Sequence, residues 1–193
     1  ESYESLDKTS NDRYQYILPY YNFDKILSQN FFNGTISINS SGNNDLNETN
    51  VLKTKLINDI NYSGFDLIND YGIKNNFNIY LKNLNSVGKN DSKLKNSPQI
   101  EFMSSLKIDS SLPLQKKGSK YTNYITPKLS FLINPSDMKN NSETKRKINN
   151  ENIFDINRLG LTDSLETGKS LTMGIEYKKE KLKDINKYFE FKL

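Results

Sequence analysis

A charged run in the C-terminal third of the chain contains the residues best suited to chemistry. In "NIFDINRLGLTDSLETGKSLTMGIEY", residues 152–177, Arg158 precedes two carboxylates, Asp163 and Glu166, and a Gly-Lys-Ser run begins at Gly168. Paired carboxylates can act as a general acid and a general base, but they require a shaped pocket. No other part of the sequence indicates such a pocket. We therefore expect these charges to pair with one another or with water.

The Gly-Lys-Ser run does not form a phosphate-binding loop. Such a loop needs a glycine five positions before its last glycine and a helix after it, so that backbone amides can wrap the phosphate. Asp163 occupies the earlier position. The residues from Ser170 to Tyr177 alternate between polar and apolar, which predicts a strand rather than a helix.

A second basic cluster lies in the segment "KNNSETKRK". Lys139, Lys145, Arg146 and Lys147 either contact the phosphates of a lipid headgroup or are simply solvated. The formal net charge of the chain is +4. An AT-rich genome favours Lys and Asn codons, and this is our first interpretation of the basic composition. A surface for nucleic acid or anionic lipid is the alternative.

The composition excludes several classes of active site. The chain has no Cys, His or Trp, so catalysis by Ser-His-Asp or Cys-His groups and a zinc site built from His or Cys are both excluded. We expect no catalytic residue, no metal and no cofactor, and we expect that the protein is not an enzyme. No apolar stretch approaches the roughly 18 residues of a membrane helix. If the chain meets a membrane, it does so with strands.

The elements that must position these charges are strands, because period-two alternation dominates the sequence. We expect strands over residues 34–41, 51–62, 76–84, 99–111, 121–133 and 170–177, and two more over 12–18 and 20–27, on either side of Pro19. These runs are about 8–13 residues long. An ordinary strand has about 5–6 residues, whereas a strand that crosses a membrane needs about 9–11.

One face of these strands is apolar, and the other carries Lys, Asn, Glu and Thr. This alternation is typical of a barrel with lipid outside and water or protein inside, although a one-sided soluble sheet shows it too. The strand length and a hydrophobic fraction of only 34% favour the barrel. The residues that we expect to face lipid are Phe77, Ile79, Leu81, Phe102, Leu106, Leu129, Phe131, Leu171, Met173 and Ile175.

Several stretches in a fixed order carry a resemblance to a known family. They are "DRYQYILPYYNFDK", "SSLPL", "ITPKLSFLINPSD" and the run of residues 152–177. Together they resemble the barrel domain of the LptD family, which assembles lipopolysaccharide (LPS) in the outer membrane of Gram-negative bacteria. The resemblance spans essentially the whole chain. It implies an all-β, antiparallel transmembrane barrel of about 26 strands, of which residues 1–193 would be a central fragment of roughly ten strands, truncated at both ends.

The resemblance also implies partners. These are LPS, the outer membrane, an LptE-like lipoprotein plug inside the barrel, and a periplasmic LPS-transport bridge that is reached through an N-terminal jelly-roll domain absent from this segment. No nucleic-acid partner is expected. LPS would leave sideways through a seam between the first and last strands, and energy would be supplied elsewhere. The alternatives are another outer-membrane barrel, such as a porin or receptor, and a soluble β-sandwich that binds carbohydrate.

The family pattern matches the charged run at Asn157, Arg158, Asp163, Glu166 and Gly168. The match implies a loop at the rim of the barrel, folded by contacts between Arg158 and a carboxylate, that directs the chain into the next strand. Two positions depart from the family pattern. A glycine stands one place early, at residue 160, and residue 164 is Ser where the family has a second Arg.

Overall fold

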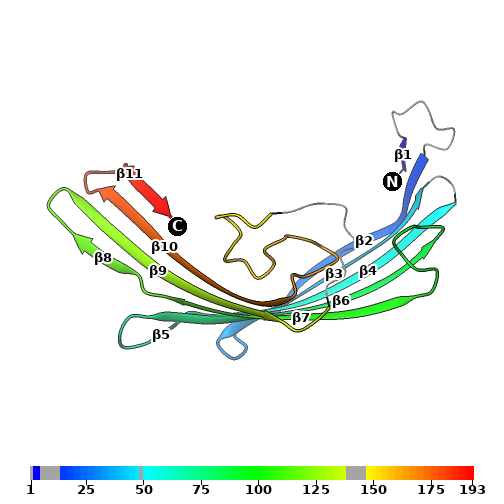
Figure 1. Ribbon diagram of the computed structural model, residues 1–193, viewed down its shortest axis with the longest axis horizontal. Coiled ribbons are helices and arrows are strands. Elements are labelled where there is room, and N and C mark those ends of the chain that lie inside the picture. Colours follow the sequence, from blue (N-terminus) through cyan, green and yellow to red (C-terminus); the bar gives the residue numbers. More distant parts are fainter. Residues whose placement is uncertain (1, 5–13, 48–49, 138–146) are drawn as a thin grey trace.

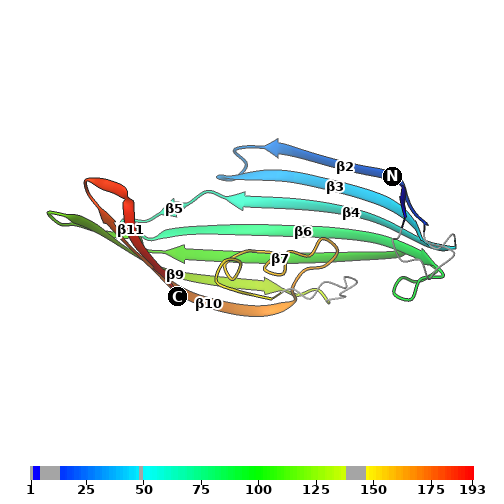
Figure 2. The ribbon, with the colours of Figure 1, turned by 90° about the horizontal axis from the view of Figure 1, so that it is seen from above.

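The computed structural model describes residues 2–4, 14–47, 50–137 and 147–193, and in these ranges the chain forms a single antiparallel sheet. The main strands follow one another in the order β1-β2-β3-β4-β6-β7-β9-β10-β11, and the short strands β5 and β8 pair with β6 and β9 (Figure 2). The bounds are β1 Ser2–Glu4, β2 Tyr14–Ser28, β3 Gly34–Asn47, β4 Val51–Gly64, β5 Leu67–Ile68, β6 Lys74–Lys89, β7 Gln99–Ser111, β8 Leu114–Lys117, β9 Tyr121–Asn134, β10 Gly168–Lys181 and β11 Asp184–Lys192.

The sheet is bent into a trough and does not close on itself. Its two outer edges, at β1–β2 and at β11, lie far apart, and the segment 147–167 lies in the concavity between them (Figure 1). The expected all-β antiparallel fold is therefore confirmed, with eleven strands in the sheet where roughly ten were expected. In the described ranges, no helix is both long and apolar enough to cross a membrane.

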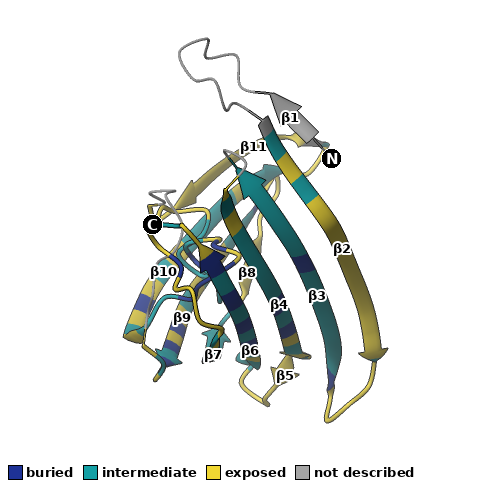
Figure 3. Ribbon diagram, turned by 90° about the vertical axis from the view of Figure 1, so that its right-hand side faces the viewer, coloured by how far each residue is buried: buried dark blue, intermediate teal, exposed yellow. Residues whose placement is uncertain are grey.

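The alternation places apolar side chains on the convex face of the sheet. Cross-strand pairing aligns Ile38 with Ile60, and Ile60 with Leu81, so that these side chains share one face. Bands of burial alternate along the strands in Figure 3, because every second residue turns toward the concavity. On the convex face Phe102 is 76% exposed and Met173 is 72% exposed. Of the positions expected to face lipid, Phe77 and Leu106 are half-buried among neighbouring convex side chains, and the others are exposed.

Two expected elements differ from the structure. The strands expected on either side of Pro19 are one continuous strand, β2, whose register with β3 shifts between Ile17 and Tyr20. Proline has no backbone N–H for the ladder, and the irregular pairing accommodates it without ending the strand. The connection expected after residue 111 contains a short strand of its own, β8, which pairs with the beginning of β9.

The longest connection between strands lies at one end of the sheet. At the opposite end, which we call the short-turn end, residues 29–33 and 182–183 form tight turns, and the connections 65–73 and 112–120 each contain a short strand. At the other end, residues 48–50 and 90–98 make connections of similar length to these, but residues 135–167 form a much longer one. In the connection 90–98, the Asp91 carboxylate accepts hydrogen bonds from the backbone N–H groups of Lys93 and Leu94 and pairs with Lys53. Desolvation by burial raises the pKa of Asp91, but these hydrogen bonds and Lys53 together lower it below its ordinary value.

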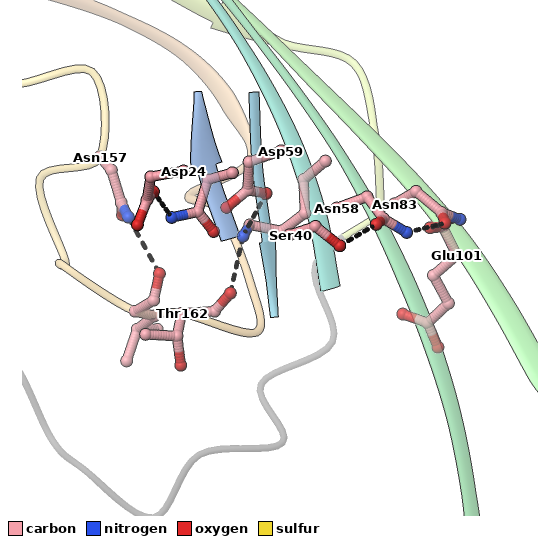
Figure 4. Close-up of polar contacts among 11 residues, drawn as sticks. Asp24, Ser40, Asn58, Asp59, Asn83, Glu101, Asn157 and Thr162 are labelled. Carbon is pink, nitrogen blue, oxygen red and sulfur yellow. Dashed lines mark hydrogen bonds and ion pairs between the residues drawn. The ribbon is translucent and has the colours of Figure 1, made fainter. Parts of the chain in front are cut away.

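A row of polar side chains interrupts the apolar convex face. Ser40 donates to Asn58 over 2.7 Å, and Asn58 donates to Asn83 over 3.2 Å (Figure 4). Asn85 also donates to Asn83, over 2.6 Å. The amides satisfy one another across β3, β4 and β6, which reduces the free energy cost of placing them on an apolar surface.

Candidate functional site on the concave face

The concave face carries charged side chains that pair across and along the strands. Lys82 of β6 lies 2.7 Å from Asp59 of β4, and Lys128 of β9 lies 2.7 Å from Glu176 of β10. On β7, Lys107 and Asp109 are 2.7 Å apart. All of these charged side chains lie at every second position of their strands, on the side of the sheet opposite the apolar face. This face of the sheet is therefore suited to water or to a polar partner rather than to lipid.

The segment 147–167 covers part of this face and is held there by a buried leucine. Leu165 is 1% exposed and packs against Ile57 of β4, Leu84 of β6 and Met103 of β7. These apolar residues occupy the polar face of the sheet. Burying a leucine side chain contributes about 1.5–3 kcal/mol, so Leu165 is an apolar anchor of the segment.

A buried lysine forms the polar anchor beside this cluster. Lys82 is 2% exposed, and its Nζ donates to Asp59 and, over 2.6 Å, to the backbone carbonyl of Thr162. Figure 4 shows Asp59 and Thr162 brought together in this way. The neighbouring Asp163 pairs with Lys55 of β4 over 3.0 Å. Two lysines of the sheet thus hold two successive residues of the segment.

Arg158 uses its guanidinium fork within the segment and at the start of β10. Its Nε donates to Glu166 Oε2 over 2.8 Å, its Nη2 contacts Glu166 Oε1, and the same Nη2 donates to Ser170 over 2.9 Å. The expected pair of Arg158 with a carboxylate is present, with Glu166 as the partner. The backbone carbonyl of Glu166 also accepts a hydrogen bond from Asn134, at the end of β9, over 2.8 Å. These contacts join the two ends of the long connection.

The remaining residues of the matched pattern shape the backbone. Asn157 donates to the carbonyl of Leu161 over 2.9 Å. Gly168 has a φ of +94°, a conformation that other residues rarely adopt, at the point where β10 begins. Ser164, where the resemblance implies an Arg, is completely buried, so an arginine at this position would require a different packing of the segment.

The position of the charged run differs from the expectation. The sequence predicts a loop at the rim, but the contacts of the run with Lys55 and Lys82 place it against the middle of β4 and β6, inside the concavity. The segment lies inside the concavity because Leu165 packs against the apolar residues Ile57, Leu84 and Met103 on the otherwise polar face. The same contacts separate Asp163 from Arg158, because Lys55 takes Asp163 as its partner.

The basic cluster is only partly covered by the structure. Lys139, Lys145 and Arg146 lie outside the described residues. Lys147 lines a polar cavity of about 500 Å³ on the segment, together with Asn149, Asn152, Asp155, Asn157, Arg158, Leu159 and Gly160. Within the described ranges, no group of three or more Asp or Glu side chains is arranged to hold a metal ion.

Comparison with known families adds the deciding observation. The family model described as "LptD: LPS transport system D" matches residues 1–192. The chain belongs to the LptD family. No curated protein matches the chain in a direct sequence comparison.

Membership of the LptD family explains why the sheet has one apolar and one polar face. The family is a transport and assembly family rather than an enzyme family, its members are large outer-membrane β-barrels, and they handle LPS. An open trough of antiparallel strands with an apolar convex face is the form expected of one part of such a barrel wall. A β-sandwich would need a second sheet, whereas the described residues form one sheet.

Sequence reasoning missed the residues that dock the segment. Leu165, Lys82 and Asp59 were not among the expected site residues, although each makes a principal contact. One signal was present in the sequence. Ile57, Leu84 and Met103 are apolar residues at polar-face positions, and such residues indicate that something apolar covers that face.

We expect Arg158→Lys to loosen the segment, because Lys cannot reproduce the bidentate contact with Glu166 or reach Ser170 as well. Arg158 is 7% exposed, so the loss corresponds to about 1.5–3 kcal/mol, the range for hydrogen bonds to charged groups. Hydrogen exchange of residues 158–166 in the full-length protein should become faster. Lys147→Ala, an exposed change in the same segment, is the control.

The competing idea is that Arg158 binds an LPS phosphate directly, in which case Arg158→Lys is nearly silent, because Lys also binds phosphate. Glu166→Gln separates the two ideas, since it weakens the pair without removing the cation. Unchanged exchange in both Arg158→Lys and Glu166→Gln would show that this pair does not order the segment.

Proposed function

We propose that this chain forms part of the wall of an outer-membrane barrel that inserts LPS into the outer leaflet of the outer membrane. The observation that carries the proposal is the match of the LptD family model over residues 1–192 to a chain that folds as one curved, two-faced antiparallel sheet. The convex face, with Phe131, Leu171 and Met173, lies against lipid. The concave face lines the barrel interior.

The open edges of the sheet fit this role. Unpaired strand edges and an uncovered apolar face are unfavourable in water and are removed when a barrel closes. We propose that residues 1–193 are one part of a single barrel domain and that further strands complete it at β1–β2 and at β11. The periplasmic jelly-roll domain and the seam through which LPS leaves belong to other parts of the protein.

The concave face is the proposed site of a lipoprotein plug of the LptE kind. Its charged pairs, such as Lys128 with Glu176, offer both donors and acceptors to a polar partner. The segment 147–167 shares the interior with the plug and narrows the path for solutes. The lysines and the arginine of the basic cluster, Lys139, Lys145, Arg146 and Lys147, are proposed contacts for LPS phosphates.

Depletion of the full-length protein in its own bacterium tests the function. We expect the amount of LPS at the cell surface to fall, and the wild-type gene supplied in trans to restore it. The matched comparison is a gene with the barrel region deleted, which should restore nothing. Normal surface LPS during depletion, together with altered uptake of a small solute, would instead indicate a porin or receptor.

A further inference from the structure

The convex face contains a groove at its short-turn end. The groove has a volume of about 380 Å³ and is lined almost entirely by carbon atoms, from Phe31, Phe32, Ile36, Ile60, Tyr62, Phe77, Ile79 and Leu81. These residues come from the turn after β2 and from β3, β4 and β6. The inference below rests on the proposed function, because it takes the convex face to lie in the membrane.

Close packing around Tyr62 builds the wall of the groove. A Cβ atom added at Gly34 would lie 2.5 Å from the Tyr62 ring, so only glycine allows the ring to lie against β3. The ring also stacks on Phe77, with centroids 5.2 Å apart, and the Tyr62 hydroxyl donates to the carbonyl of Phe32 over 2.7 Å. The turn of residues 29–33 is thereby fixed against the face of the sheet.

An exposed cation lies beside this groove on the same face. Lys25 of β2 pairs in register with Ile38 of β3, and Ile38 is the next convex residue after Ile36 of the groove. Lys25 has no ion-pair partner among the residues that the structure describes. It stands three residues before the end of β2 at Ser28, which is roughly 10 Å along the strand.

We propose that the groove and Lys25 together bind one glycerophospholipid, with an acyl chain in the groove and the phosphate on the Lys25 ammonium. A cation on a lipid-facing surface is unfavourable at the bilayer midplane and costs little near the interface. The long side chain of Lys25 can extend toward that interface, where it meets phosphate. The aromatic rings at the end of the groove are of the type found at headgroup depth.

The position of the groove favours a glycerophospholipid over LPS. In bacterial outer-membrane barrels the short turns are periplasmic and the long loops are external. The longest connection, residues 135–167, lies at one end of the strands, and the groove opens at the other end, near residues 29–33, so it borders the periplasmic leaflet. LPS delivered to the outer leaflet would meet the opposite end of these strands.

Lipid retention by the full-length protein tests the proposal. The protein is reconstituted with a mixture of palmitoyl-oleoyl phosphatidylglycerol, lipid A and dioleoylglycerol. Of these three lipids, only dioleoylglycerol has no phosphate. Native mass spectrometry then counts the lipids that stay bound to the protein after extraction. Lys25→Gln removes the cation, and Ile79→Trp fills the groove. The matched controls are Lys183→Gln, in the turn before β11 at the same end, and Leu171→Trp, on the convex face outside the groove.

We expect phosphatidylglycerol to be retained by the wild type and by both controls. Lys25→Gln should lower its retention about tenfold, which corresponds to roughly 1.4 kcal/mol, and should leave dioleoylglycerol unaffected. Ile79→Trp should lower the retention of both. The proposal would be overturned if Lys25→Gln and Ile79→Trp retained as much phosphatidylglycerol as the wild type does. It would also be overturned if the wild type retained lipid A in preference to phosphatidylglycerol. Surface LPS, measured in parallel, should be normal in cells that express these variants. A failure of the proposed function is a separate result, because surface LPS would then stay normal in cells depleted of the protein.

Discussion

Replacing Leu165 with Asp should release the segment 147–167 from the concave face while the sheet remains folded. Leu165 is 1% exposed among Ile57, Leu84 and Met103, where a carboxylate would lie against apolar side chains and be shielded from water. Losing the apolar side chain and burying an unpaired charge together cost about 3–5 kcal/mol. When the segment leaves, the buried ion pair of Lys82 is opened to water.

The release can be measured in cells that express the full-length protein. An added protease should cleave the Leu165→Asp protein within residues 147–167, and the cells should become sensitive to antibiotics that normally cross the outer membrane poorly. Leu159→Asp is the matched control, since Leu159 is half-buried at the polar cavity and outside the apolar cluster. Equal protease resistance of the wild type and Leu165→Asp would mean that Leu165 does not anchor the segment.

The second large effect is expected on the convex face. Phe131→Arg should lower the free energy of unfolding from a bilayer by up to about 2–4 kcal/mol, because an arginine on the lipid-facing side of a barrel costs this much at the midplane and less toward the interface. Phe131 pairs in register with Leu171 and Ile108, so it is surrounded by apolar side chains and has no acidic neighbour there. Denaturant titration of the full-length protein in lipid vesicles measures the change.

The control for this substitution follows from the structure. The sequence pattern places Asn78 and Thr172 equally on the polar face. Thr172, however, is only 8% exposed, so a long side chain would be crowded there. Asn78 is half-buried on the concave face, and Asn78→Arg should therefore cost little. A cost for Asn78→Arg as large as that for Phe131→Arg would mean that the two faces do not differ in their surroundings.

Local pattern was sufficient to predict the strands and their faces. In β6, β7, β9 and β10 most apolar residues recur at every second position, and the structure places these on the convex face, with Leu84, Met103 and Leu132 as the exceptions that face the concavity. In β4 the polar and apolar residues do not alternate regularly. The structure explains this, because Ile57 faces the concavity to meet Leu165 while Asn58 faces outward to join the polar row.

The docked segment could not be predicted in the same way. Lys82 and Thr162 are 80 residues apart in the sequence, and neither position has a local pattern that indicates the other. The charges of the run suggested a self-contained loop in which Arg158 pairs with a nearby carboxylate. That pair is present, but the position of the segment is set by partners on distant strands, Lys55 and Lys82.

The central claim is that the convex face meets lipid and the concave face meets water. Spin labels on single cysteines test it directly, in a cysteine-free background of the full-length protein reconstituted in lipid. A label at Met173 should collide mainly with oxygen, which concentrates in the bilayer. A label at Asn78 should collide mainly with a water-soluble nickel chelate. Preferential collision of the Met173 label with the nickel chelate, and of the Asn78 label with oxygen, would contradict the account.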